Sequence, residues 1–143
     1  MAGKHCVQEL YNANSFKLND PEFIRTALIH AAHKASATLL DISVHPFPEQ
    51  GVTAFALLAE SHISFHSWPE VGYAAIDVFT CGEVTQPERA CSFLADTFEA
   101  KGQHILTLDR YTPIVTSQDT EVNSVKIDTS SHTECERRTA ISV

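Results

Sequence analysis

The sequence predicts an α+β fold, a two-layer sandwich in which an antiparallel sheet carries helices packed on one face. The chain has 143 residues, of which 43% are hydrophobic, and this is enough for the core of one domain. Several strand patterns are joined by short connections, which favours antiparallel pairing. Two longer segments show apolar residues at helical spacing, so helices are available to cover one face of the sheet.

The domain is expected to begin with a strand and a helix. Residues 5–11 have the pattern of a short strand. The segment 19–22, NDPE, predicts a helix start, because Asn19 or Asp20 can cap the helix and Pro21 fits its first turn. The apolar positions that follow at helical spacing are Phe23, Ile24, Ala27, Leu28, Ala31 and Ala35.

The middle of the chain is expected to be mostly strands. Residues 39–44 predict one strand, and the two prolines and the glycine of 46–51 predict a loop after it. The segment 52–58 is mostly apolar, as expected for a strand in the core. Apolar and polar residues alternate in 62–66, which predicts a half-buried strand, and 73–79 predicts another strand. One face of the strand at 39–44 is expected to carry Leu40, Ile42 and Val44.

The last expected elements are a second helix and a strand. The segment 85–88, TQPE, opens the helix, and Gly102 suits the position just beyond the helix end. Residues 103–108 predict the final strand. We therefore expect one domain over residues 1–111 and a polar C-terminal extension over 112–143, which has few large apolar side chains. The sheet face without helices must be solvated or buried in a dimer. The apolar stripe of the second helix consists of Ala90, Phe93, Leu94, Thr97 and Phe98.

Charge and composition exclude several classes of function. The formal net charge of -8 argues against a nucleic-acid partner, which needs a basic face. The start of the chain lacks the apolar core of a signal peptide, and no apolar run is long enough to span a bilayer, so we expect a cytoplasmic protein without membrane association. The cysteines form no CxxC pair, which favours reduced thiols; they are Cys6, Cys81, Cys91 and Cys135.

The most informative segment is 60–70, ESHISFHSWPE, which is followed by VFTCG at 78–82. Serine is common in turns, so residue type alone favours a plain turn at Glu60 and Ser61. A tight, strained turn, however, would hold the Ser61 hydroxyl near the carbonyl carbon of Glu60, and its attack would convert the peptide bond into an ester. β-Elimination then releases the upstream chain and leaves dehydroalanine at position 61. Hydrolysis of the dehydroalanine gives a pyruvoyl group and ammonia.

These two segments resemble the processing site and active site of the prokaryotic S-adenosylmethionine decarboxylases, and the resemblance extends over about residues 3–111. It implies a proenzyme that cleaves itself between Glu60 and Ser61 into a β chain, 1–60, and an α chain, 61–143. Ser61 would become a covalent pyruvoyl cofactor, whose carbonyl forms a Schiff base with the substrate. The implied reaction is decarboxylation of S-adenosylmethionine to S-adenosylmethioninamine, the aminopropyl donor for spermidine biosynthesis.

The resemblance assigns proton transfers to two residues. His66 would transfer a proton during processing, and Cys81 would protonate the substrate α-carbon during decarboxylation. Imidazole titrates near neutral pH, and a thiol with an ordinary pKa of about 8.5 is mostly protonated there. From residue type alone, His66 is also compatible with a surface histidine or a metal pair with His62. No third ligand stands at a suitable spacing, so we predict no metal site. Cys81 is also compatible with a small core residue.

The resemblance also assigns substrate contacts. Phe47 would stack on the adenine ring, and Glu70 would accept hydrogen bonds from the ribose hydroxyls. Thr53 stands where many relatives carry a serine that assists processing, and its hydroxyl can still donate. Val71 replaces a tyrosine that is common at that position. Two further aromatic residues are expected to serve in packing: Phe65 and Trp68.

The resemblance finally implies a homodimer of cleaved αβ units with active sites at the subunit interface. Two alternatives stay open: a pyruvoyl-dependent decarboxylase of ornithine or arginine, and a non-catalytic relative that regulates an active subunit. Phe47 and Glu70 favour a nucleoside substrate over ornithine or arginine. The presence of Ser61, His66 and Cys81 argues against a non-catalytic relative.

Overall fold

A computed structural model describes residues 2–111 of the chain. The expected extension at 112–143, Cys135 included, lies outside the described residues. In chain order the elements are β1 (Ala2–Tyr11), α1 (Ser15–Leu18), α2 (Pro21–Lys34), β2 (Leu39–Pro46), β3 (Val52–Leu58), β4 (Ser61–Trp68), the 3₁₀ turn η1 (Pro69–Val71), β5 (Tyr73–Cys81), α3 (Pro87–Thr97) and β6 (Gly102–Tyr111).

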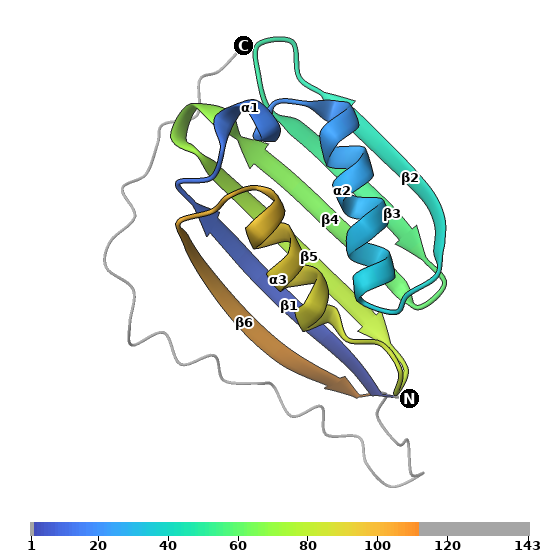
Figure 1. The fold of residues 1–143 in the computed structure, drawn as a ribbon. Coiled ribbons are helices and arrows are strands. Elements are labelled where there is room, and N and C mark those ends of the chain that lie inside the picture. The colour runs from blue at the N-terminus through green and yellow to red at the C-terminus, as the bar shows by residue number, and fades with distance from the viewer. Residues whose placement is uncertain (1, 112–143) are drawn as a thin grey trace, which may run out of the picture. The chain divides into compact units, whose positions relative to one another are not determined.

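The strands form one six-stranded sheet in the order β2-β3-β4-β5-β1-β6, and every neighbouring pair is antiparallel. The helices α1, α2 and α3 all lie on the same face of this sheet (Figure 1). The expected two-layer α+β sandwich is therefore confirmed. No helix in the described residues is long and apolar enough to cross a membrane.

The core lies between the sheet and the two long helices. Alternate residues of β4 and β5 point toward the helices and are fully buried, among them Phe65 and Val78. The ring of Phe98, just after α3, packs 5.0 Å from the Phe65 ring, so the end of that helix is fixed against the middle of the sheet. The helices contribute Ile24, Leu28, Ala31, Ala90 and Leu94 to the same cluster.

The opposite face of the sheet, which we call the open face, carries no helix. Because side chains alternate along a strand, it receives every second residue of each strand. Large apolar and aromatic side chains remain about half exposed on it, including Phe55 at 42% and Trp68 at 42% of full exposure. Such an area on a sheet is typical of a surface that another molecule covers. Further partly exposed members of this face are Tyr11, Leu57, Leu106 and Leu108.

Two sequence-based expectations were wrong in detail. Leu40 does not share a face with Ile42, because the pairing of β2 with β3 shifts at a bulge between Leu39 and Asp41, and Leu40 is exposed. Gly102 does not terminate α3. The left-handed position after this helix belongs to Glu99, with φ of 55°, and Gly102 instead begins β6.

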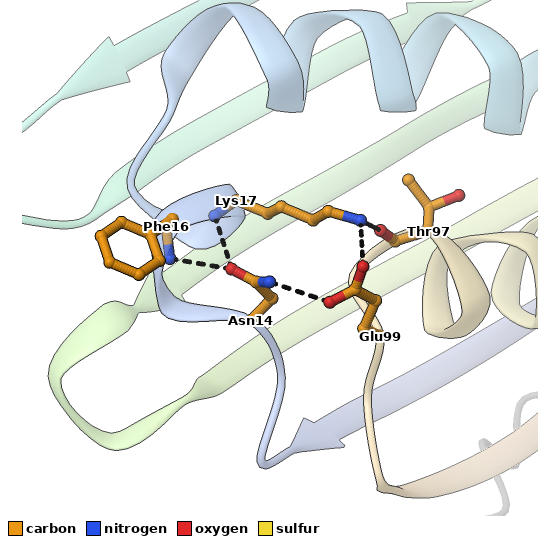
Figure 2. Close-up of polar contacts among 5 residues, drawn as sticks. All are labelled: Asn14, Phe16, Lys17, Thr97 and Glu99. Carbon is orange, nitrogen blue, oxygen red and sulfur yellow. Dashed lines mark hydrogen bonds and ion pairs between the residues drawn. The ribbon is translucent and has the colours of Figure 1, made fainter.

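The short helix α1 was not predicted, since four residues are too few for a periodic pattern. Figure 2 shows how it is held. The Asn14 side chain caps α1 by accepting from the backbone amides of Phe16 and Lys17, and its amide donates to the Glu99 carboxylate at 2.8 Å. The Lys17 ammonium donates to Glu99 at 2.8 Å and to the Thr97 carbonyl at 2.9 Å, so α1 is tied to the end of α3.

Candidate active site

The bond between Glu60 and Ser61 lies in a two-residue hairpin turn. Leu58 and Ser61 are the last paired residues of β3 and β4, which leaves only Ala59 and Glu60 in the loop. The φ angle of Ser61 is 150°, in a region that residues with a side chain rarely adopt. Such a backbone costs on the order of 1–3 kcal/mol and persists only where the surroundings enforce it. The turn is therefore tight and strained, as the cleavage hypothesis requires.

Neighbouring segments enforce this conformation through hydrogen bonds to both the backbone carbonyl and the side-chain carboxylate of Glu60. The Glu60 carbonyl oxygen accepts a hydrogen bond from the backbone N–H of Cys81 at 2.9 Å. Its carboxylate accepts from the backbone N–H of Thr38 at 2.8 Å and from the Thr38 hydroxyl at 3.1 Å. The donor from Cys81 polarises the carbonyl and would stabilise an oxyanion that forms there. The contact also brings Cys81 against the turn, at the end of β5.

The Ser61 hydroxyl lies next to an imidazole. Its Oγ is 3.2 Å from Nδ1 of His62, the following residue. The His62 ring stacks on Phe55 with ring centroids 5.3 Å apart and meets Phe79 edge-on at 6.0 Å. Burial, together with the positive charge that His5 can carry, lowers the pKa of His62 below its ordinary value. The ring is therefore neutral over a wider range of pH and able to accept a proton.

The other predicted residues gather at the far end of β4. A cavity of about 370 Å³ opens there, and the Thr53 hydroxyl is 2.9 Å from Nδ1 of His66 at its wall. Phe47, in the loop after β2, and Glu70, in η1, also line it. The remaining lining residues are Glu49, Gln50, Ser67 and Trp68. An aromatic ring, a carboxylate and a histidine thus converge on one concave site.

The walls of this cavity are tied to α1. The Ser67 hydroxyl donates to the Leu18 carbonyl at 2.7 Å and accepts from the backbone N–H of Val52 at 2.9 Å. The backbone N–H of Gly51 donates to the side-chain oxygen of Asn19 at 2.9 Å. The network around Lys17 in Figure 2 therefore supports the elements that shape the cavity.

One chain does not bring all predicted residues together. Ser61 and His66 are five positions apart on the same strand, and the rise of about 3.3 Å per residue separates them by about 16 Å. Glu60, Ser61 and Cys81 meet at one end of β4, whereas His66 and the cavity residues lie at the other end. The described residues contain no cluster of three or more potential metal ligands.

The chain also matches known proteins over nearly all of its described residues. A family model described as S-adenosylmethionine decarboxylase matches residues 4–111. The chain belongs to the S-adenosylmethionine decarboxylase family.

Individual members of the S-adenosylmethionine decarboxylase family match over most of their length. A proenzyme of that name from Prochlorococcus marinus (strain MIT 9313) is 54% identical over 113 residues, covering 79% of this chain and 90% of the relative. One from Synechococcus sp. (strain WH7803) is 52% identical over 118 residues, covering 82% and 92%. The crystal structure of the adenosylmethionine decarboxylase from Aquifex aeolicus superimposes with a TM-score of 0.68 at 33% identity, covering 83% of this chain and 97% of that one.

Sequence reasoning missed three residues of the site. His62 had been considered only as part of a metal pair, although its place directly after Ser61 was a usable signal. Thr38 is distant in sequence from the turn that it anchors, and nothing in its surroundings pointed to Glu60. Trp68 was expected to be a packing residue, and its ring does lie 5.2 Å from that of Tyr73, but the side chain also lines the cavity.

Gly51→Ala is expected to destabilise the loop that carries Phe47. Gly51 has φ of 94°, and an added Cβ would lie 2.8 Å from the Ser67 carbonyl oxygen. The conformation alone would cost on the order of 1–3 kcal/mol. The matched control is Gly102→Ala, where an added Cβ meets Tyr11 at an ordinary 3.7 Å. Denaturant unfolding should show a large loss for the first variant only, and equal losses would contradict this role of Gly51.

Proposed function

We propose that this chain is a proenzyme that cleaves itself between Glu60 and Ser61 and then decarboxylates S-adenosylmethionine to S-adenosylmethioninamine, the aminopropyl donor for spermidine biosynthesis. Family membership supports the reaction and the substrate. The observation that carries the site assignment is the strained turn, in which the Glu60 carbonyl is already polarised by the Cys81 N–H. The enzyme is thus a carboxy-lyase of polyamine biosynthesis.

The residues at the turn fit the formation of a pyruvoyl group from Ser61. The hydroxyl attacks the Glu60 carbonyl carbon, and the peptide bond becomes an ester to Ser61 Oγ. Loss of the Ser61 Cα proton expels the Glu60 carboxylate and leaves dehydroalanine, which water converts to pyruvoyl and ammonia. The products are residues 1–60 and 61–143. The strain at Ser61 favours this sequence because relief of strain accompanies loss of the peptide bond.

The bound cofactor supplies a carbonyl that takes up the electrons of the breaking bond to the carboxylate. The proton transfers are then carried out by residues of this chain. Cys81 is held at the turn through its backbone N–H and lies only partly buried. We assign its thiol to protonation of the substrate α-carbon. This role needs a free thiol, which supports a reducing, cytoplasmic compartment.

The cavity at the far end of β4 fits a nucleoside. Phe47 offers a half-exposed ring for stacking on adenine, and Glu70 offers a carboxylate for the ribose hydroxyls. Ornithine and arginine have neither a base nor a ribose. Together with the family assignment, these contacts do not support the two alternative functions.

The 16 Å separation supports a homodimer with shared sites. The open face leaves Phe55 and Trp68 about half exposed, as expected for a surface buried between subunits. If two open faces pack together about a two-fold axis that crosses the strands, the Ser61 end of one β4 faces the His66 end of the other. Packed sheets lie about 10 Å apart, which long side chains span. Thr53 and His66 of one subunit would thus assist processing at Ser61 of its partner.

Self-cleavage is tested by intact mass. The wild-type chain should give fragments 1–60 and 61–143, the second without a free amino terminus. Ser61→Ala should remain full length, because alanine has no nucleophile. Cys81→Ala retains the backbone N–H to Glu60, so it should cleave, but its decarboxylase turnover should fall by about 10²-fold or more when the acid is lost. An active wild-type protein that stays full length would disprove the proposal.

Shared sites are tested by co-expression. Ser61→Ala and His66→Ala should each remain uncleaved or cleave slowly when expressed alone. In a mixed dimer, one site combines the intact Ser61 of one chain with the intact His66 of the other. The His66→Ala chain should therefore be cleaved in the mixture, as a mass spectrum of differently tagged chains will show. No cleavage in a mixture that contains mixed dimers would contradict the shared arrangement.

Substrate choice is tested by release of labelled carbon dioxide from S-adenosylmethionine, ornithine and arginine. Only the first should be used. Glu70→Gln should lower kcat/KM for S-adenosylmethionine. The lost stabilisation of the transition state should be about 1.5–3 kcal/mol, the contribution of a hydrogen bond to a charged group. Phe47→Ala should also weaken it, whereas Phe47→Tyr keeps the stacking face and should retain most activity. Preferential use of ornithine or arginine by the wild type would refute the substrate assignment while leaving the cleavage chemistry intact.

A further inference from the structure

We propose that His62 is a catalytic residue of the self-cleavage, the base that takes the Ser61 hydroxyl proton and returns it to the departing amide nitrogen. The inference rests on the proposed function and assigns one proton transfer within it. The resemblance to the family placed proton transfer during processing on His66 alone. Within a single chain His66 lies about 16 Å along the strand from Ser61, and in the proposed dimer it would assist at the other subunit's turn, whereas His62 contacts the Ser61 hydroxyl of its own chain.

The contact between the two side chains has the geometry of a nucleophile and its base. Ser61 Oγ and His62 Nδ1 are 3.2 Å apart, within the reach expected of a general base before the reaction begins. With the ring proton on Nε2, Nδ1 accepts the hydroxyl hydrogen. Among the hydrogen bonds of residues 2–111, this is the one that the Ser61 hydroxyl makes.

The ring is held in place on both sides. Phe55 from β3 stacks on it with an interplanar angle of 21°, and Phe79 from β5 approaches it edge-on at 72°. A ring fixed in this way loses little entropy when it accepts the proton, because its orientation is already set. A packing role for His62 would need only the ring shape, which gives the experiment its main distinction.

The charged groups around the ring come from three other strands. His5 on β1 and Arg110 on β6 oppose a positive charge on His62, whereas Asp77 on β5 favours it. Asp77 is partly occupied, since it accepts from the Ser64 hydroxyl at 2.9 Å and pairs with His5 at 3.2 Å. The sum lowers the pKa of His62, with burial as the largest cause. Neutral imidazole is the form that a base requires.

The proposed step is balanced in bonds and protons. The Oγ–C bond from Ser61 to Glu60 forms while the hydroxyl proton moves to Nδ1 of His62. The Cys81 N–H holds the oxygen that becomes negative. The C–N bond to Ser61 then breaks, and the proton moves from His62 to the nitrogen. The products are an ester and a free amine, and His62 is neutral again.

The first experiment compares cleavage rates of full-length chains made by cell-free synthesis. His62→Phe keeps an aromatic ring between Phe55 and Phe79 but removes the base. His62→Asn keeps a hydrogen-bond acceptor that cannot take up a proton. Both should cleave about 10²-fold or more slowly than the wild type, as measured by intact mass. The control is His5→Asn, which removes a histidine of the same cluster whose ring lies 6.5 Å from that of His62, and it should cleave readily.

The second experiment identifies the step that is blocked. Neutral hydroxylamine cleaves esters far faster than amides, so it reveals any chain arrested after the acyl shift. Uncleaved His62→Phe should resist hydroxylamine, because the peptide bond is intact. In His62→Gly, added imidazole should restore cleavage, whereas pyrrole, a ring of the same size without a basic nitrogen, should not.

The outcomes separate this inference from the function on which it rests. If folded His62→Phe and His62→Asn cleave as fast as the wild type, the role of His62 is overturned and the proposed function still stands. Hydroxylamine-sensitive His62→Phe overturns it too, since the shift would have occurred without the imidazole. A wild-type chain that never cleaves rejects the proposed function itself.

Discussion

The extended geometry of β4 is the constraint on which the candidate site depends. A strand fixes both the face and the distance of its residues, so Ser61 and His66 lie at opposite ends of one element. Each end is built from different neighbours: the turn is built from Thr38 and Cys81, and the cavity from Phe47 and Glu70. Under the proposed function, a single chain therefore carries two separated halves of the active site. The exposed open face offers a simple way to join the halves of two chains.

The strained turn survives because the sheet around it is rigid. Ser61 is already paired with both β3 and β5, so its backbone cannot relax without loss of ladder hydrogen bonds. The hydrogen bonds of Glu60, one to its carbonyl and two to its carboxylate, fix the other side of the bond. Strain of a few kcal/mol is small beside the stability of such a ladder, yet it is concentrated at one peptide bond. The fold thus concentrates strain at the bond where we propose that the chain is cleaved.

Much of the fold could be predicted from the sequence because its patterns are regular. The strand alternation at 62–66 correctly placed Ile63 and Phe65 in the core, and the Asp20 cap with Pro21 marked the start of α2. Irregular features escaped because they depend on pairing with a distant segment. The bulge at Leu40 is set by the register with β3, and the helix end at Glu99 is set by contacts with α1.

For the site, residue identities were easier to predict than their relations. The segment 60–70 identified Ser61 and His66 as candidate site residues. A motif, however, gives the order of residues along the chain and not the distance between them in space. Contacts from other parts of the chain, such as that of Thr38 with Glu60, left no local trace.

The two histidines of β4 lie in different surroundings, and we assign them different roles. His62 and His66 share the open face and are four residues apart, yet they have different partners. His62 contacts the Ser61 hydroxyl and packs against aromatic rings, and its burial lowers its pKa. His66 contacts the Thr53 hydroxyl at the wall of the cavity, where a substrate or a partner subunit can reach it. One strand can therefore contribute a nucleophile with its base at one end and a histidine beside a binding cavity at the other.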